Sequence, residues 1–278
     1  MTHGKNILRI LIGFAALFAV LCATSCEEEM KDFEVETAQS RLVIDAECNA
    51  MKGAITVRLS RTVSFVSSEK NPPVSGATIT LRYNSTTLNL IEMSEGLYVA
   101  YALFPEKTRY ELTVEAEGET YTATSYMPQR VNFTDVTYEK ITHNPMFPSI
   151  EYGGDTTYMV TLSFLDPQAE DNFYRVVIYR NDTLAHRDLT IMNDTYFTAD
   201  TIHYSPWQRF YENDVLSLEL RSFDRTAYRF YSSMQAAMEA GGAFSVPDNP
   251  ISNFSGGALG HFTAFSGDKY TLALNRLE

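Results

Sequence analysis

The sequence predicts a mainly β protein, and three observations support that prediction. Apolar and polar residues alternate with a period of two in many short runs, which is typical of strands with one buried face. Gly, Pro, Asn and Asp separate these runs. A helical spacing of apolar residues stands out at about 225–240. The expected architecture is an N-terminal immunoglobulin-like β-sandwich followed by a second β-rich domain that carries one aromatic-rich α-helix.

Residues 1–25 have the pattern of a bacterial lipoprotein signal peptide. Two basic residues precede an uncharged, mostly apolar stretch at 10–23, which is shorter than the roughly 20 residues of a membrane-spanning helix. The sequence Ala23-Thr24-Ser25-Cys26 resembles a lipobox, in which the Cys is acylated and the preceding peptide is removed. We therefore expect lipidation of Cys26. An ordinary secretory signal with an incidental Cys is the alternative.

Residues 26–37 are predicted to form a lipidated acidic tether. Glu27, Glu28 and Glu29 follow the Cys directly. In Bacteroidota lipoproteins, acidic residues at this place resemble a signal for the outer face of the outer membrane, whereas the simpler interpretation is a solvated charge run. The resemblance implies an outer-membrane, lipid-anchored protein that faces the cell exterior. The lipid is expected to be its only membrane attachment, because nothing later in the sequence is long and apolar enough to span a membrane.

Residues 38–128 are predicted to form the immunoglobulin-like sandwich, with roughly seven strands. The alternating runs lie at 42–48, 55–60, 77–83, 110–116 and 121–125. In the second run, Ile55, Val57 and Leu59 share one face. Residues 69–76 are expected to form a loop, because they contain two prolines, which cannot donate to a ladder.

Residues 129–278 are predicted to form the second β-rich domain. Strands are expected at 131–138, 158–165, 173–179, 215–221, 259–265 and 270–274. The last two are expected to flank a turn at Ser266-Gly267-Asp268. Turns are also expected at Asn181-Asp182 and at Gly256-Gly257, and a loop rich in Pro and Gly at 143–155.

The predicted helix begins after Asp224, which is a good N-cap, and ends before Gly241-Gly242. Its apolar stripe consists of Ala227, Tyr228, Tyr231, Met234, Ala237 and Met238. Such a stripe usually packs on a sheet. A ligand groove is the alternative.

Composition excludes some classes of function. The 278 residues are 45% hydrophobic and 13% aromatic, which is enough apolar material for a packed core. The formal charge is −13, and this acidity argues against nucleic acid, whose binders need a basic surface.

Cysteine and histidine counts limit the chemistry. After signal removal and acylation of Cys26, only Cys48 remains, so we expect no internal disulfide and a small buried side chain at Cys48. The His residues have no metal-ligand spacing, and no nucleotide-binding or nucleophile motif occurs. No catalytic residue, metal site or cofactor is predicted, and we expect no enzymatic activity. Carboxylates are abundant, so a hydrolase with an unrecognised carboxylate pair stays open as a third hypothesis.

Several segments together match one family pattern. They are the acidic stretch after Cys26, the strands at 41–46 and 55–61, the segment 72–79, the aromatic helix, Asn249-Pro250-Ile251-Ser252-Asn253, and Gly256-Gly257-Ala258-Leu259-Gly260-His261-Phe262. The chain thus resembles the Bacteroidota outer-membrane lipoproteins catalogued as domain of unknown function 4249. That family usually has an aromatic residue where His261 stands.

The resemblance implies a surface lipoprotein encoded beside a TonB-dependent receptor. Such a protein is expected to be a non-enzymatic accessory that helps to capture substrate at the outer mouth of the receptor barrel. The resemblance brings no catalytic residues with it. It also draws attention to three triplets that resemble a Bacteroidota O-glycosylation sequon, which makes Thr156, Thr183 and Thr201 candidate acceptors.

The alternative function is a free-standing glycan- or protein-binding adhesion module on the cell surface. It depends on the dense aromatic cluster near residue 207, where Tyr204, Trp207 and Tyr211 are candidate ligand or partner contacts. Aromatic residues also fill sheet cores, and the chain has a single Trp.

Overall fold

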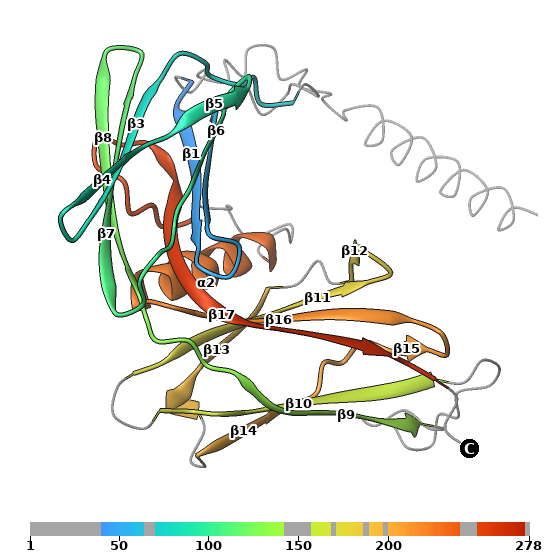
Figure 1. Ribbon diagram of the computed structural model, residues 1–278. Coiled ribbons are helices and arrows are strands. Elements are labelled where there is room, and N and C mark those ends of the chain that lie inside the picture. Colours follow the sequence, from blue (N-terminus) through green and yellow to red (C-terminus); the bar gives the residue numbers. More distant parts are fainter. Residues whose placement is uncertain are drawn as a thin grey trace, which may run out of the picture. The chain divides into compact units, whose positions relative to one another are not determined.

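The computed structural model describes residues 40–63, 70–141, 157–167, 171–185, 189–196, 200–239 and 249–275. In this part of the chain the protein is mainly β with one α-helix, which confirms the predicted fold class (Figure 1). Cys26, the three glutamates after it and Thr156 lie outside the described residues.

Most of the described residues lie in strands. The strands up to residue 127 are β1 (Leu42–Asn49), β2 (Ala54–Arg61), β3 (Thr78–Tyr83), β4 (Thr86–Asn89), β5 (Ile91–Ser94), β6 (Leu97–Tyr101), β7 (Thr108–Ala116) and β8 (Glu119–Met127). The later strands are β9 (Phe133–Ile141), β10 (Thr157–Leu165), β11 (Phe173–Arg180), β12 (Thr183–Leu184), β13 (Thr190–Asn193), β14 (Thr201–Tyr204), β15 (Phe210–Tyr211), β16 (Val215–Phe223) and β17 (Leu259–Ala273). The helix is α2 (Arg225–Glu239), and a short 3-10 helix covers Asp194–Tyr196.

The described strands form three sheets. A nine-stranded sheet has the order β12-β11-β16-β17-β1-β2-β6-β5, with β13 also pairing with β11. A four-stranded sheet has the order β4-β3-β7-β8. In the third sheet, β10 pairs with β9 and with the short strands β14 and β15. Strand β17 joins the two halves of the large sheet, because it is parallel to β1 and antiparallel to β16 (Figure 1).

Side-chain alternation along β17 shows how the layers are stacked. Phe262 and Ala264 belong to the core that the large sheet shares with β3, β7 and β8. Farther along the same face, Leu272 packs against the core shared with β9 and β10. Phe265 points to the opposite face and packs beneath α2. The two smaller sheets therefore cover one face of the large sheet, and the helix covers part of the other.

The prediction of two strands around Ser266-Gly267-Asp268 is wrong. Residues 259–273 form one continuous strand, and these three residues pair with Ser222, Arg221 and Leu220 of β16. Gly267 is needed because the two backbones approach closely: a Cβ there would lie 2.1 Å from the Leu220 carbonyl oxygen. A glycine between two alternating runs can therefore indicate a close approach of two strands and not only a turn.

Other local predictions are confirmed. Helix α2 covers nearly the expected residues, and the Asp224 carboxylate accepts a hydrogen bond from the Ala227 backbone N–H at 2.8 Å. Asn181 and Asp182 form a hairpin turn with positive φ at both residues, as a type I′ turn requires. Cys48 is a fully buried free thiol.

The predicted boundary at 128/129 coincides with a change of core but not with a break in the sheet. The first core consists of buried side chains between Leu42 and Met127, together with four from the C-terminal part of the chain: Phe254, Ala258, Phe262 and Ala264. The described residues all belong to one compact unit, Ser40–Glu278. The division into two domains and the immunoglobulin-like topology stay predictions.

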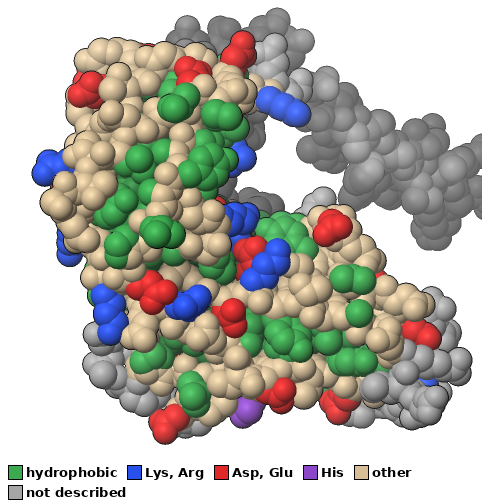
Figure 2. All heavy atoms as spheres, in the orientation of Figure 1, with side chains coloured by type: hydrophobic (Ala, Val, Ile, Leu, Met, Phe, Trp, Pro, Cys, Tyr) green, Lys and Arg blue, Asp and Glu red, His purple; other side chains and the backbone are tan. Residues whose placement is uncertain are grey.

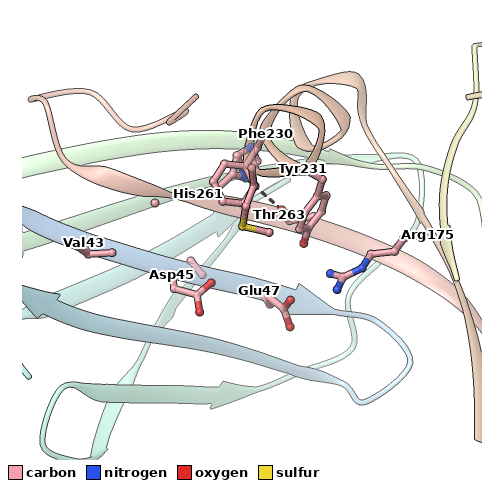
Figure 3. Close-up of a pocket in the computed structure, with 11 residues that line it drawn as sticks. Val43, Asp45, Glu47, Arg175, Phe230, Tyr231, His261 and Thr263 are labelled. Atoms are coloured by element: carbon pink, nitrogen blue, oxygen red, sulfur yellow. Dashed lines mark hydrogen bonds between the residues drawn. The ribbon is translucent and has the colours of Figure 1, made fainter. Parts of the chain in front are cut away.

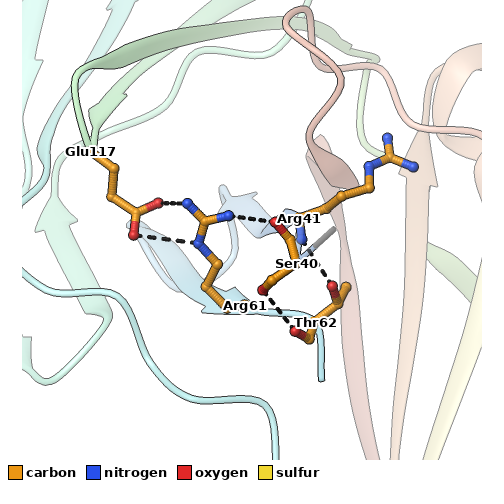
Figure 4. Close-up of polar contacts among 5 residues, drawn as sticks. All are labelled: Ser40, Arg41, Arg61, Thr62 and Glu117. Atoms are coloured by element: carbon orange, nitrogen blue, oxygen red, sulfur yellow. Dashed lines mark hydrogen bonds and ion pairs between the residues drawn. The ribbon is translucent and has the colours of Figure 1, made fainter. Parts of the chain in front are cut away.

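A polar clamp holds the place where the described chain begins (Figure 4). The Arg61 side chain donates to the Ser40 carbonyl oxygen at 2.7 Å and pairs with Glu117 in the β7–β8 turn. Ser40 and Arg41 also bond Thr62, at 2.8 and 2.9 Å. The first described residues are thus fixed to β2.

Candidate functional site

A cavity of about 310 Å³ lies beneath helix α2, on the face of the large sheet that the helix covers (Figure 3). Its lining comes from four elements and combines charged, aromatic and aliphatic groups. The lining residues are Val43, Asp45, Ala46 and Glu47 of β1, Arg175 of β11, Phe230, Tyr231 and Met234 of α2, and Gly260, His261 and Thr263 of β17. A volume near 300 Å³ is at the lower end of the range for small-molecule sites.

The floor of the cavity is formed by the paired strands β1 and β17. In the register of this pair, Asp45 lies beside His261 and Glu47 beside Thr263. Gly260 makes the close pairing possible, because its φ is +91° and a Cβ would lie 2.1 Å from the Ile44 carbonyl oxygen. The floor therefore depends on a glycine that alternation alone does not reveal.

The segment 249–258 fastens this floor to its neighbours. The Asn253 side-chain amide pairs with the backbone of Phe262 as a neighbouring strand would. Its oxygen accepts from the Phe262 N–H, and its NH2 group donates to the Phe262 carbonyl oxygen, both at 2.9 Å. The Ile251 N–H donates to the Ser233 hydroxyl of α2 at 2.9 Å. Sheet, loop and helix are consequently held in one arrangement.

Helix α2 forms the roof, and aromatic packing fixes its orientation. Tyr231 packs on Phe223 at 5.5 Å between ring centroids, and Tyr228 on Phe173 at 5.0 Å. At the N-cap, the second carboxylate oxygen of Asp224 accepts from the Tyr126 N–H at 2.7 Å, which ties the helix to β8. The first four residues of the predicted stripe, from Ala227 to Met234, pack on the sheet, whereas Met238 is 57% exposed. Tyr231 and Met234 also line the cavity.

Two arginines lie directly opposite each other beside the cavity, Arg175 on β11 and Arg221 on β16. Arg221 is buried and neutralised: it pairs with Glu219 at 2.6 Å and with Glu47 at 3.7 Å. Burial opposes its charge, but these two carboxylates outweigh burial and raise the pKa of Arg221.

Arg175 is less well satisfied than Arg221. Its guanidinium lies 4.9 Å from the centre of the Tyr231 ring, and no carboxylate among the described residues forms an ion pair with it. Its Nε atom is buried and has no hydrogen-bond partner in the described structure. Like charges opposite each other destabilise a sheet unless they are compensated. Arg175 therefore presents a donor that the surrounding protein leaves unused.

His261 is a second incompletely satisfied group. It is 3% exposed, its ring lies 4.6 Å from the Phe230 ring, and its Nδ1 is 3.1 Å from the Thr263 hydroxyl. Its Nε2 is buried without a partner among the described residues. Burial lowers the pKa of His261 to about 3, so the ring is neutral at physiological pH.

The two carboxylates of β1 give the floor a negative side. Partial burial raises the pKa of Asp45, the adjacent Glu47 raises it further, and Arg58 opposes both effects. Asp45 is opposite Arg58 in the β1–β2 register. In Figure 3, Glu47, Tyr231 and Arg175 lie at one end of the lined space, and Val43 lies toward the other. The site can thus offer charged groups at one end and apolar contacts at the other.

Metal binding finds no support in the described part of the chain, where no cluster of three or more His, Cys, Asp or Glu side chains is placed to hold an ion. On the face that Figure 2 shows, the Asp and Glu side chains are scattered among other residues. No helix in the described residues has the length and hydrophobicity to cross a membrane.

A family model described as Domain of unknown function (DUF4249) matches residues 28–271. The chain belongs to the DUF4249 family. This confirms the resemblance inferred from the sequence, and the family's description names no function. No curated protein matches the chain. Among solved structures, one described as a cytokine receptor complex (crystal form 1A) is 10% identical and covers 84% of this chain and 95% of its own, with a TM-score of 0.26. A score that low has no bearing on fold or function.

The aromatic cluster predicted in this DUF4249 chain is not gathered on one face. Tyr204 pairs with Leu162 and packs against the second core. Tyr211 pairs with Thr157, five positions away along β10, so its side chain points to the opposite face. Trp207 lies between them and is 73% exposed. The structure therefore places Tyr204 and Tyr211 on opposite faces of the third sheet.

The candidate O-glycosylation residues differ in access. Thr183 is exposed in β12, and Thr201 is partly buried in β14. An exposed hydroxyl at a hairpin is the more accessible acceptor.

Sequence reasoning missed the polar lining of the cavity. Asp45 and Glu47 alternate with buried residues, which is the pattern of an ordinary solvated strand face. Arg175 had a weak signal, because it interrupts the apolar run Phe173–Arg180. His261 had the clearest sequence signal, since the resemblance leads us to expect an aromatic residue at its position.

Proposed function

We propose that the protein is a lipid-anchored, non-enzymatic accessory of a TonB-dependent transporter, and that it captures a small ligand on the outer face of the outer membrane. The observation that carries the capture role is the cavity beneath α2, with the unused donor of Arg175 and the buried Nε2 of His261. Buried polar atoms without partners are uncommon, and ligand sites are one place where they occur.

The anchoring part of the proposal is supported by the signal pattern that ends at Cys26. Cys26→Ser should release the protein from the outer membrane, because several buried acyl chains are needed for firm attachment. Cys22→Ser is the matched control, since Cys22 lies in the segment that is removed. Metabolic labelling with palmitate and membrane fractionation measure both variants. Continued membrane attachment of the Cys26→Ser protein would contradict lipidation at this residue.

The transporter part is tested by co-purification. A tagged, lipidated protein is extracted from outer membranes in mild detergent, captured, and analysed by mass spectrometry. The expected result is a stoichiometric TonB-dependent barrel that is absent from a capture on an unrelated tagged lipoprotein. Recovery of the protein without any such barrel would contradict the accessory role.

An adhesion module is the second candidate, and the exposure of Trp207 favours it. A solvent-exposed Trp can stack on a sugar ring or anchor a protein interface. Trp207→Ala should then weaken binding to a glycan array or to host extracellular-matrix proteins at least tenfold. Unchanged binding would remove the one observation that supports this candidate.

A further inference from the structure

The environment of Arg175 indicates which chemical group is missing from the cavity. Arg175 and Arg221 are cross-strand neighbours, so their like charges repel. Glu219 and Glu47 compensate Arg221, whereas no ion pair within the described chain compensates Arg175. A guanidinium with an unused N–H is suited to a planar anion, which it binds through charge-assisted hydrogen bonds.

The rest of the lining limits the size and charge of that anion. Phe230, Met234 and Val43 offer apolar contacts, and β1 spans roughly 13 Å between Val43 and Glu47 at about 3.3 Å per residue. Asp45 and Glu47 lie on the same floor, so they disfavour ligands with more than one negative charge. A small body with a single anionic group fits both conditions.

We propose that the cavity beneath α2 binds a small monocarboxylic acid, with its carboxylate on Arg175 and its apolar body against Phe230 and Met234. His261 lines the same cavity. This inference rests on the proposed capture function and names the ligand class for it. Two kinds of ligand carry such a carboxylate. One is a simple organic acid, and the other is an amino acid whose ammonium group Asp45 and Glu47 would bind.

Three matched probes separate these sources in isothermal titration calorimetry with the full mature chain. They are 3-phenylpropionate, L-phenylalanine and 2-phenylethylamine, which carry the same ring and differ in their charged groups. Comparable binding of the first two indicates a simple organic acid. Binding of L-phenylalanine at least tenfold tighter than that of 3-phenylpropionate indicates an amino acid. In both cases 2-phenylethylamine should bind at least tenfold more weakly than the better carboxylate.

Variants of two arginines on β11 test the assigned residue. Arg175→Met keeps the length of the side chain and removes the charge, and it should weaken carboxylate binding at least tenfold. Arg175→Lys should recover part of the affinity. Arg180→Met is the matched control, because Arg180 lies on the same strand over the Tyr211 ring and outside the cavity. Thermal unfolding confirms that each variant is folded.

The proposal is overturned if neither carboxylate probe binds, if 2-phenylethylamine binds as well as the acids, or if folded Arg175→Met binds as tightly as the wild type. These measurements need no barrel. A protein that binds the acids and yet co-purifies with no transporter would support the site and contradict the accessory role. The reverse pattern would support the accessory role and contradict the site.

Discussion

At the scale of single residues, His261 should make the fold sensitive to acid. Burial lowers its pKa to about 3, whereas the unfolded chain has an ordinary His pKa near 6.5. The unfolded state therefore binds the proton more readily, and the free energy of unfolding falls as pH drops from about 6.5 towards 3. The expected loss is about 1.4 kcal/mol per pH unit in that window, with no contribution above it. His261→Phe should remove this part of the acid sensitivity.

Urea unfolding of both proteins at several pH values between 4 and 7.5 measures the effect. The stability difference between His261→Phe and wild type should widen in favour of the variant as pH falls. His203→Gln is the control variant, because His203 is an exposed histidine on β14 that lies outside the cavity. Parallel curves for wild type and His261→Phe would contradict the assigned role.

The same residues show what the sequence could reveal about the site. His261 could be marked as unusual from the sequence, because it stands where an aromatic is expected. Arg175 could not be assigned a role, since its significance comes from its position opposite Arg221, 46 positions later in the chain. Charge compensation is a property of strand register, which alternation within one segment does not fix.

At the scale of elements, Asp224 joins helix α2 to the sheet below it. One carboxylate oxygen caps the helix through the Ala227 N–H, and the other accepts from the Ser125 hydroxyl and the Tyr126 N–H. Asp224→Ala should lower the free energy of unfolding by about 2–4 kcal/mol, because a cap is lost and partly buried donors are left without acceptors. Urea unfolding followed by circular dichroism measures this loss.

A neighbouring substitution serves as the control for the helix. Arg225→Ala removes the next side chain, which makes an exposed ion pair with Asp171 and lies 5.3 Å from the centre of the Phe173 ring, and it should cost about 1 kcal/mol. Similar losses for the two variants would mean that Asp224 acts only as a surface charge. The cap itself could be predicted from the sequence. Its link to β8 could not, since Tyr126 lies 98 positions away.

Strand β17 shows the corresponding limit for strands. The alternating pattern was sufficient to predict strand structure at both ends of β17. The sequence does not show which of two roles Gly267 has between these ends. A glycine opens a turn in one context and admits a neighbouring backbone in another. Here the Leu220 carbonyl oxygen occupies the space of the missing side chain, so the strand continues.

At the scale of the whole molecule, β17 makes the first sandwich depend on the last part of the chain. Seven residue pairs join β1 to β17, and Phe254, Ala258, Phe262 and Ala264 fill the first core. The fragment 38–128, predicted from sequence as a domain, should therefore not fold cooperatively alone, because β1 would have an open edge and an exposed apolar face. Dispersion of amide signals in NMR and urea unfolding test this expectation.

A fusion of 38–128 to 249–266 through a flexible Gly/Ser linker is the matched comparison, since it restores both the β17 edge and the missing core residues. The fusion should show a cooperative transition that the fragment lacks. If the fragment alone unfolds as cooperatively as the fusion, then the first sandwich is self-sufficient and β17 is an addition to it. Because β17 also forms the floor of the cavity with β1, the expected result would mean that the site exists only when the two ends of the chain have come together.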